Sequence, residues 1–185
     1  MTTPDTIDAL CALPCFRDVP RTAVSALAEA CTIREFSTRD EVIAQGTATD
    51  AAYLVVDGML EVSVEARRSY HHIATISPGE VVGESALFIL GVQRNATVLA
   101  HKPSRCLEIR PATLRTLAGN RAVMALELYL VAALSRRIRN TNLEIQGAWK
   151  QTHPEDFTEK FKPDEGPRTF AGRLKDIFSG RGGDR

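Results

Sequence analysis

The short apolar segments between residues 34 and 110 are the feature that most constrains the fold. These segments are rich in β-branched residues and are repeatedly interrupted by turn residues. Asp57-Gly58 and Pro78-Gly79 both lie between such segments, and dipeptides of this kind mark tight turns. Many short strands at even spacing favour a compact antiparallel roll or barrel. We therefore expect a hairpin at Asp57-Gly58 and a second turn at Pro78-Gly79.

Helical patterns flank this strand-rich region on both sides. Residues 7–33 have a helical apolar period, and Pro20 suits the first turn of a helix over residues 21–31. Residues 111–119 read as a short helix that ends at a glycine, and a long helical pattern without proline covers residues 121–150. The predicted fold class is α+β: a jelly-roll-like β-roll with N-terminal helices and a long C-terminal helix.

The long C-terminal helix carries an apolar seam that predicts dimerisation. Apolar residues recur at every seventh position of this helix, as in a coiled coil: they are Met124, Val131, Ile138 and Ile145. Leu134, Thr141 and Ala148 lie three positions after the last three of these, so Thr141 is a polar break in the seam. We expect two copies of the chain to pair along this helix as a homodimer.

We divide the chain into a domain over residues 1–147 and a flexible tail over residues 148–185. The tail is rich in proline, glycine and charge, a composition typical of linkers and disordered segments. Within it, one helical face collects the apolar residues Phe170, Leu174, Ile177 and Phe178. A helix that short is marginal alone, so this segment either docks on something or frays.

Charge and cysteine usage exclude several classes of protein. The 23 basic and 23 acidic residues balance, which argues against a nucleic-acid-binding face. No apolar run approaches the roughly 20 residues of a membrane span, and the N-terminus lacks the basic region of a secretory signal. The four cysteines, at positions 11, 15, 31 and 106, form no C-x-x-C pair. We expect a cytoplasmic protein with reduced thiols and no metal site.

The stretch GESALFILGVQRNATV, residues 83–98, raises the question of function. It begins with Gly83-Glu84 and ends with a lone arginine, Arg94, set among small residues between apolar runs. A guanidinium near a core is costly unless an anion or hydrogen-bond acceptors compensate its charge. We therefore expect Arg94 to meet an anionic partner.

This stretch resembles the phosphate-binding cassette of the cyclic nucleotide-binding domain family. The resemblance rests on Gly83-Glu84, a short helix around Ala86, Gly91, and Arg94-Asn95-Ala96, with the spacing found in catabolite activator proteins. Glycines at Gln45-Gly46 and at the two dipeptides named above agree with the flanking pattern of that family. The resemblance extends from about residue 10 to residue 145, and it implies a β-roll that binds a cyclic nucleotide.

The resemblance also implies roles for individual residues. Arg94 would grip the cyclic phosphodiester through charge-assisted hydrogen bonds, and Glu84 would accept a hydrogen bond from the ribose 2′-hydroxyl. Backbone N–H groups at the start of the short helix would point at the same phosphate oxygens. The candidate binding residues of the cassette are Gly83, Glu84, Ser85, Ala86, Arg94, Asn95 and Ala96.

Two further candidates lie in the long helix. In catabolite activator proteins, a pair of arginines is followed by a threonine and a small polar residue that lie over the adenine. Here Arg136-Arg137 precede Thr141 and Asn142 with the same spacing. The resemblance therefore implies that Thr141 and Asn142 accept hydrogen bonds from the adenine N6 amino group. Cyclic AMP is the expected ligand, with cyclic GMP as the alternative.

The parts that the sequence lacks narrow the class of function. Only about forty residues follow Ile145, without the pattern of a helix-turn-helix module, and no nucleophile–base pair suggests catalysis. We expect a stand-alone, non-enzymatic receptor that signals through contacts with an unidentified protein. Two alternatives stay open. Glu84 and Arg94 could pair with each other in a ligand-free adaptor whose tail does the binding, or the four cysteines could hold an iron–sulfur cluster in a redox sensor.

Overall fold

The computed structural model describes residues 3–66, 69–89 and 91–152. The chain divides into two compact units, residues 1–136 and residues 137–185, and the long C-terminal helix contributes to both. The helices are α1 (Pro4–Cys11), the short 3-10 helix η1 (Pro14–Phe16), α2 (Arg21–Glu29), α3 (Ser85–Phe88), α4 (Pro111–Thr116) and α5 (Arg121–Thr152). The strands are β1 (Thr32–Phe36), β2 (Glu41–Ile43), β3 (Ala52–Ala66), β4 (Ser69–Ile76), β5 (Val81–Val82) and β6 (Thr97–Ile109).

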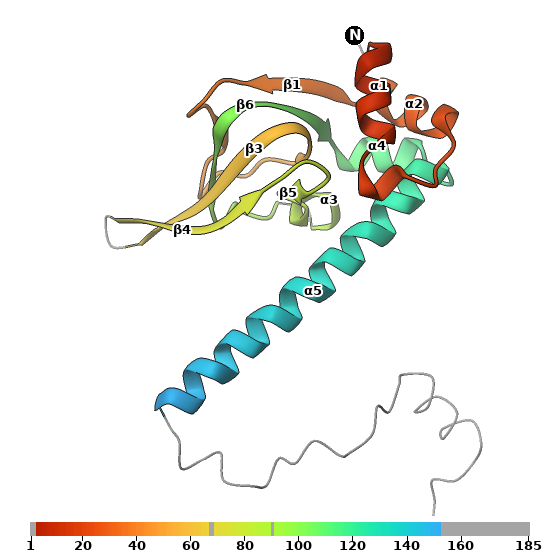
Figure 1. Ribbon diagram of the computed structural model, residues 1–185. Helices are drawn as coiled ribbons and strands as arrows, with labels where there is room; N and C mark the ends of the chain where they lie inside the picture. The colour runs from red at the N-terminus through yellow and green to blue at the C-terminus, as the bar shows by residue number, and fades with distance from the viewer. Residues whose placement is uncertain (1–2, 67–68, 90, 153–185) are drawn as a thin grey trace, which may run out of the picture. The chain divides into compact units, whose positions relative to one another are not determined.

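The strands form one antiparallel sheet in the order β1-β6-β3-β4, with β2 paired to β6 and β5 paired to β3 (Figure 1). The long strands β3 and β6 lie side by side at its centre, and the cassette lies between β5 and β6 in the sequence. This architecture confirms the predicted α+β fold, a β-roll with N-terminal helices and a long C-terminal helix.

The central strands bury side chains on both faces of the sheet, because successive residues of a strand point to opposite faces. On β3, Leu54 and Val56 join a core that the helices cover, whereas Val55 joins the core inside the roll. On β6, Leu107 packs in the helix-covered core and Cys106 in the roll. Two cores therefore share one sheet, which explains why these strands are apolar at consecutive positions.

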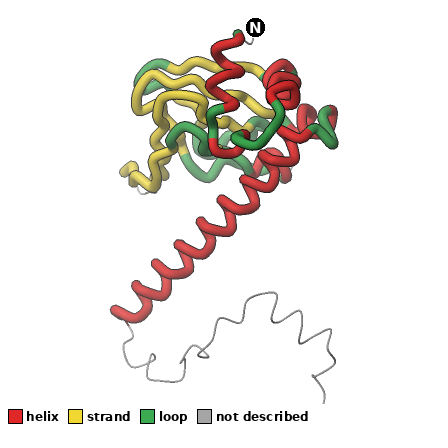
Figure 2. The backbone as a smooth tube through the Cα atoms, turned by 45° about the vertical axis from the view of Figure 1, so that its right-hand side comes forward, coloured by secondary structure: helices red, strands yellow, loops and turns green. Residues whose placement is uncertain are grey.

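The helices of the first unit gather beside one end of the roll (Figure 2). Pro20 is the N-cap of α2, and Gly119, with a φ of +84°, separates α4 from α5. The side chain of Asn120 begins α5 by accepting a hydrogen bond from the amide of Ala122 at 2.7 Å. Leu87 of α3 packs in the same core as these helices, so the cassette is joined to them by apolar contact.

The predicted hairpin at Asp57-Gly58 is wrong. Both residues lie inside the single strand β3, where the pairing with β6 shifts register on either side of Asp57. Gly58 has a φ of +100°, and a Cβ atom there would lie 2.3 Å from the side-chain oxygen of Ser104. The dipeptide therefore forms a β-bulge that lets β6 approach closely. Glycine inside a strand often marks such a bulge rather than a turn. The turn at Pro78-Gly79 does separate β4 from β5.

Helix α5 begins and continues as predicted, with two faces of different exposure. Ala122, Val123, Leu126 and Leu130 are buried. The predicted seam residues Met124, Val131, Ile138 and Ile145 are instead between 51% and 62% exposed. The predicted tail begins within this helix, and its apolar segment around Phe170–Phe178 lies outside the described residues.

The four cysteines are free and do not converge on one point. Cys15 packs in the helix-covered core, whereas Cys106 packs inside the roll on the opposite face of the sheet. Among the described residues, no group of three or more histidine, cysteine or acidic side chains could hold a metal ion. The hypothesis of an iron–sulfur cluster held by all four cysteines therefore has no support in this part of the chain.

None of the helices within residues 3–66, 69–89 and 91–152 combines the length and the apolar character needed to cross a bilayer.

The buried thiols predict how stability depends on pH. Burial raises the pKa of Cys15, Cys31 and Cys106 to about 12, from an ordinary value near 9. Above pH 9 the unfolded chain loses these protons while the folded chain keeps them, so the free energy of unfolding should fall as pH rises. Each thiol contributes a slope of up to about 1.4 kcal/mol per pH unit. Urea unfolding between pH 7 and pH 10.5 measures this slope, and a free energy of unfolding that stays constant would contradict it.

Candidate functional site

The cassette begins with a backbone conformation that only glycine adopts easily. Gly83 follows β5 and has a φ of +75°, which lies in the left-handed region. A Cβ atom at this position would lie 2.7 Å from Nη1 of Arg94 and 2.9 Å from Cδ1 of Ile43. The sequence therefore needs glycine here for two reasons: the turn itself, and the close approach of the arginine.

The guanidinium of Arg94 is held by three hydrogen bonds, all to uncharged acceptors. Its Nε donates to Oγ1 of Thr49 at 2.8 Å, and its Nη1 donates to the carbonyl of Gly83 at 2.9 Å. Its Nη2 donates to the carbonyl of Ala51. These bonds fix the plane of the guanidinium and use three of its five N–H donors.

The backbone of Arg94 is fixed as well. Its amide donates to the carbonyl of Thr47 at 2.8 Å, and its carbonyl accepts from the amide of Gly46 at 2.7 Å. The residue is only 6% exposed. Arg94 thus has backbone and side chain pinned to the segment between β2 and β3, so the predicted glycine turn at Gln45-Gly46 is part of the site.

Burial acts directly on the charge of this arginine. Desolvation lowers the pKa of Arg94, and the negative charges that Tyr53, Glu84 and Asp50 carry when ionised act in the opposite direction. An arginine nevertheless stays protonated in proteins. The site therefore holds a buried cation whose hydrogen bonds go to neutral groups, and an anion would stabilise it.

The cassette residues named from the sequence lie around this cation with different exposure. Glu84 and Ala86 are buried, Ser85 and Asn95 are exposed, and Ala96 is half-buried. The other two candidates, Thr141 and Asn142, are exposed residues of α5 in the second unit.

Three backbone amides of the α3 turn, those of Ala86, Leu87 and Ile89, are already engaged. The amide of Ala86 donates to the carbonyl of Gly83 at 3.2 Å, and the amide of Leu87 donates to the carbonyl of Glu84 at 3.0 Å. The amide of Ile89 donates to the carbonyl of Ser85 at 2.9 Å. These three N–H groups close the turn on itself, whereas the guanidinium of Arg94 keeps two N–H donors for an incoming anion.

A small cavity of about 90 Å³ lies between the cassette and the segment before β3. Its lining includes Thr49 and Asp50 on one side, and Ala86, Ile89 and Val92 on the other. Pockets for drug-sized ligands usually measure about 300–1,000 Å³. The cavity has room for a small anionic group, while the rest of a nucleotide would have to extend beyond it.

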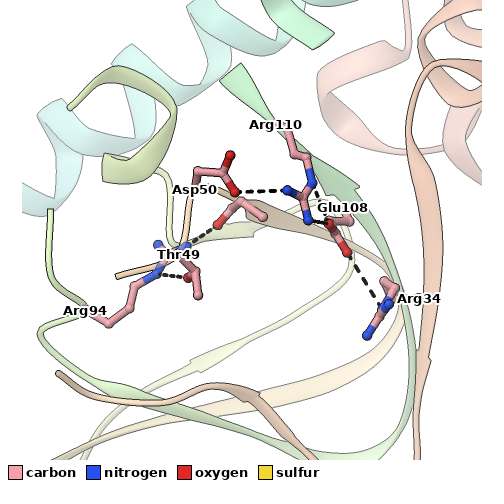
Figure 3. A network of polar contacts seen from close by, with 7 residues as sticks. Arg34, Thr49, Asp50, Arg94, Glu108 and Arg110 are labelled. Atoms are coloured by element: carbon pink, nitrogen blue, oxygen red, sulfur yellow. Dashed lines mark hydrogen bonds and ion pairs between the residues drawn. The ribbon is translucent and has the colours of Figure 1, made fainter. Parts of the chain in front are cut away.

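A chain of ion pairs that the sequence did not reveal continues from this segment. Asp50 pairs with Arg110 at 3.1 Å, and Arg110 pairs with Glu108 at 2.8 Å. Arg34 lies 3.7 Å from the other carboxylate oxygen of Glu108 (Figure 3). Arg34 and Asp50 lie far from Glu108 and Arg110 in the sequence, and no motif joins them. The period-2 pattern of β6 does indicate that Glu108 points away from the helix-covered core, which leaves a buried carboxylate in need of cations.

The comparisons with known proteins agree with this geometry. Residues 33–121 match the family model described as "Cyclic nucleotide-binding domain". The chain is 32% identical over 92 residues to the Pycsar effector protein PaPycTIR of Pseudomonas aeruginosa, covering 50% of this chain and 29% of that protein. It is 28% identical over 117 residues to the cAMP-activated global transcriptional regulator CRP of Pasteurella multocida (strain Pm70), covering 62% of this chain and 54% of that protein. The chain thus spans about half or less of these relatives.

A solved structure shows the same fold. A cyclic nucleotide-binding domain from Methylobacillus flagellatus KT aligns with a TM-score of 0.64 over 78% of this chain and 82% of that chain. The two sequences are 18% identical, so the likeness concerns the fold.

The steric role of Gly83 can be tested by replacing it with alanine, which adds one methyl group. Gly83→Ala should lower the free energy of unfolding by about 2–4 kcal/mol, because it adds left-handed strain and contacts with Arg94 and Ile43. Gly119→Ala is the matched control, since Gly119 is also left-handed but has no atom within 4 Å of the added Cβ. It should cost only the backbone strain, about 1–2 kcal/mol. Equal losses in urea unfolding would show that the arginine does not crowd Gly83.

Proposed function

Because this chain belongs to the cyclic nucleotide-binding domain family through residues 33–121, we propose that it is a receptor for a cyclic nucleotide whose phosphate binds Arg94. The observation that supports this most is the buried guanidinium, whose hydrogen bonds within the described part of the chain go to Thr49 and to two backbone carbonyls. A cyclic phosphodiester carries one negative charge and two exposed oxygens. It would compensate this cation through donors that the protein leaves over.

Glu84 supports the same function from the sugar side. It is 9% exposed and lies one residue after the carbonyl that fixes Arg94. A buried carboxylate beside a phosphate-binding arginine is suited to accept a hydrogen bond from a ribose hydroxyl. Its negative charge also raises the pKa of Arg94. In this proposal the phosphate compensates the positive charge of Arg94, and the ribose 2′-hydroxyl donates a hydrogen bond to the carboxylate of Glu84.

Cyclic AMP is the nucleotide that we propose. One relative, whose match covers 62% of this chain, is named as a cAMP-activated regulator. Thr141 and Asn142 are exposed in α5, so both can accept a hydrogen bond from the N6 amino group of adenine. Guanine carries a carbonyl at the corresponding position, and an acceptor facing it would stay unpaired.

We propose that the receptor is a homodimer paired along α5. The seam residues Met124, Val131, Ile138 and Ile145 are all more than half exposed, although large apolar side chains gain free energy on burial. Near the start of the helix, Met124 and Leu128 also line a groove of about 440 Å³ shared with Pro14, Val19 and Tyr129. A second copy would cover these surfaces by knobs-into-holes packing.

The output of the receptor would be a contact with another protein rather than catalysis. Cyclic nucleotide-binding domains are typically regulatory modules. The chain carries no net positive charge that would attract nucleic acid, and we propose that the receptor acts in the cytoplasm on a protein partner.

The nucleotide proposal predicts distinct effects for the two charged cassette residues. Arg94→Ala should weaken cyclic AMP binding by at least about 30-fold, because the phosphate loses its charge-assisted hydrogen bonds. Glu84→Ala should weaken it less and should reduce the preference for cyclic AMP over 2′-deoxy cyclic AMP. Titration calorimetry against cyclic AMP, cyclic GMP and cyclic di-GMP measures these affinities.

Arg105→Ala is the control for this experiment, because Arg105 forms an ion pair with Asp5 and takes no part in the cassette. It should bind as the unmodified chain does. Unchanged affinity in Arg94→Ala would refute the phosphate-binding role, and a chain that binds none of the three nucleotides would favour the adaptor hypothesis.

The base-reading proposal predicts a loss of selectivity without a loss of fold. The unmodified chain should prefer cyclic AMP to cyclic GMP by about 5–100-fold, the value of one unpaired polar group. Replacing both Thr141→Ala and Asn142→Ala should erode this preference, while circular dichroism should show the same helix content. Equal affinity of the unmodified chain for the two nucleotides would overturn the assignment of these residues.

A further inference from the structure

We propose that Asp50 is a positioning residue for Arg94: it holds the segment that carries the arginine's acceptors without itself binding the phosphate. This inference rests on the proposed nucleotide-binding function. It concerns three consecutive residues, Thr49, Asp50 and Ala51, which precede β3.

The three residues alternate in what they contact. Thr49 and Ala51 accept hydrogen bonds from the guanidinium of Arg94. Asp50 between them points the other way and accepts a hydrogen bond from Nη1 of Arg110 at 3.1 Å (Figure 3). Two of the three acceptors that orient Arg94 therefore lie on either side of Asp50, and Asp50 is bonded to Arg110. A shift of this segment would move both acceptors together.

The other end of the tie is fixed in the fold. Arg110 is the N-cap residue of α4 and follows β6 directly. Its Nε and Nη2 both donate to Oε1 of Glu108, at 2.9 and 2.8 Å. Glu108 is 8% exposed, so this carboxylate is itself locked in place. Asp50 is thus held by a rigid partner, and the tie links the phosphate-binding arginine to the junction between the roll and the helices.

The same geometry pairs the carboxylate of Asp50 with a cation beside the proposed phosphate site. Asp50 lines the small cavity together with Thr49, which bonds directly to Arg94. An unpaired carboxylate there would repel an incoming anion, and the partner Arg110 neutralises it. The pair therefore serves binding in two ways, by fixing the segment and by screening a negative charge.

The exposure of the pair predicts an effect on affinity rather than on stability. The side chains of Asp50 and Arg110 are 65% and 55% exposed. Exposed ion pairs contribute little to folding, because solvent screens them and ordering two long side chains costs entropy. Asp50 can therefore be replaced without unfolding the chain. Arg110 cannot serve for this test, since its removal would leave the buried Glu108 without its main partner.

The test compares Asp50→Asn with Asp50→Glu and with Thr49→Val. Asp50→Asn should weaken cyclic AMP binding by about three- to tenfold, and Asp50→Glu should restore most of it, because the longer carboxylate can still reach Arg110. Thr49→Val removes an acceptor of Arg94 directly. The double variant Thr49→Val with Asp50→Asn should lose less than the product of the two single losses, since both act through the same guanidinium.

Asp8→Asn is the matched control, because Asp8 forms an exposed ion pair with Arg21 between α1 and α2. It should bind cyclic AMP like the unmodified chain. The melting temperatures of Asp8→Asn and Asp50→Asn should be similar, so that a loss confined to Asp50→Asn reports on the site.

A second readout needs no nucleotide. The Nε–H resonance of Arg94, assigned by its disappearance in Arg94→Lys, should be slow to exchange with solvent in the ligand-free chain. In Asp50→Asn it should shift and exchange faster, because the acceptor Oγ1 of Thr49 is no longer held. Asp8→Asn should leave the resonance unchanged.

Each outcome decides the proposal. A weaker affinity together with a changed Arg94 resonance in Asp50→Asn supports it. An unchanged resonance overturns it, and if affinity still falls, Asp50 acts on the nucleotide itself. An unchanged affinity in a chain that binds cyclic AMP also overturns it. If the unmodified chain binds no cyclic nucleotide, the proposed function fails, and the resonance alone then decides whether Asp50 positions Arg94.

Discussion

The buried guanidinium of Arg94 is the interaction on which the rest of the site depends. A cation that is 6% exposed needs acceptors for its donors and a compensating charge. The chain supplies the acceptors from three places, the carbonyls of Gly83 and Ala51 and the hydroxyl of Thr49. It brings Glu84 and Asp50 near enough to raise the pKa of Arg94, while burial acts more strongly to lower it. The chain's own groups thus orient the guanidinium, and the site favours an anion.

The fold provides this arrangement by using both faces of one sheet. Leu54 and Leu107 anchor the central strands against the helices, while Val55 and Cys106 fill the roll. The cassette returns to the helix-covered core through Leu87. A change in the turn that carries Glu84 and Ser85 can therefore reach α4 and the start of α5 through apolar packing as well as through Arg110 and Asp50. The cassette thus shares one apolar core with the first turns of α5, the helix that we propose as the dimer interface.

Local sequence patterns predicted much of the fold but only part of the site. The cassette was recognisable because Gly83, Glu84 and Arg94 have a fixed spacing and each has a separate chemical reason to be there. The predicted hairpin at Asp57-Gly58 was wrong because an Asp-Gly dipeptide, which usually marks a turn, also permits a bulge. The contact of Gly58 with Ser104 of β6 distinguishes the two, and the local sequence does not show it. The partners of Arg94 at Thr49 and Ala51 could not be predicted, since tertiary pairing over more than 40 residues leaves no periodic trace in the sequence.

A crystal structure of the chain with cyclic AMP tests the central claim most directly. The account predicts a phosphate oxygen within about 3 Å of a guanidinium nitrogen of Arg94. It also predicts that the hydrogen bonds to Thr49 and to the carbonyl of Gly83 persist. A nucleotide that binds with its phosphate on another cation, or an Arg94 that turns away from the ligand, would contradict it.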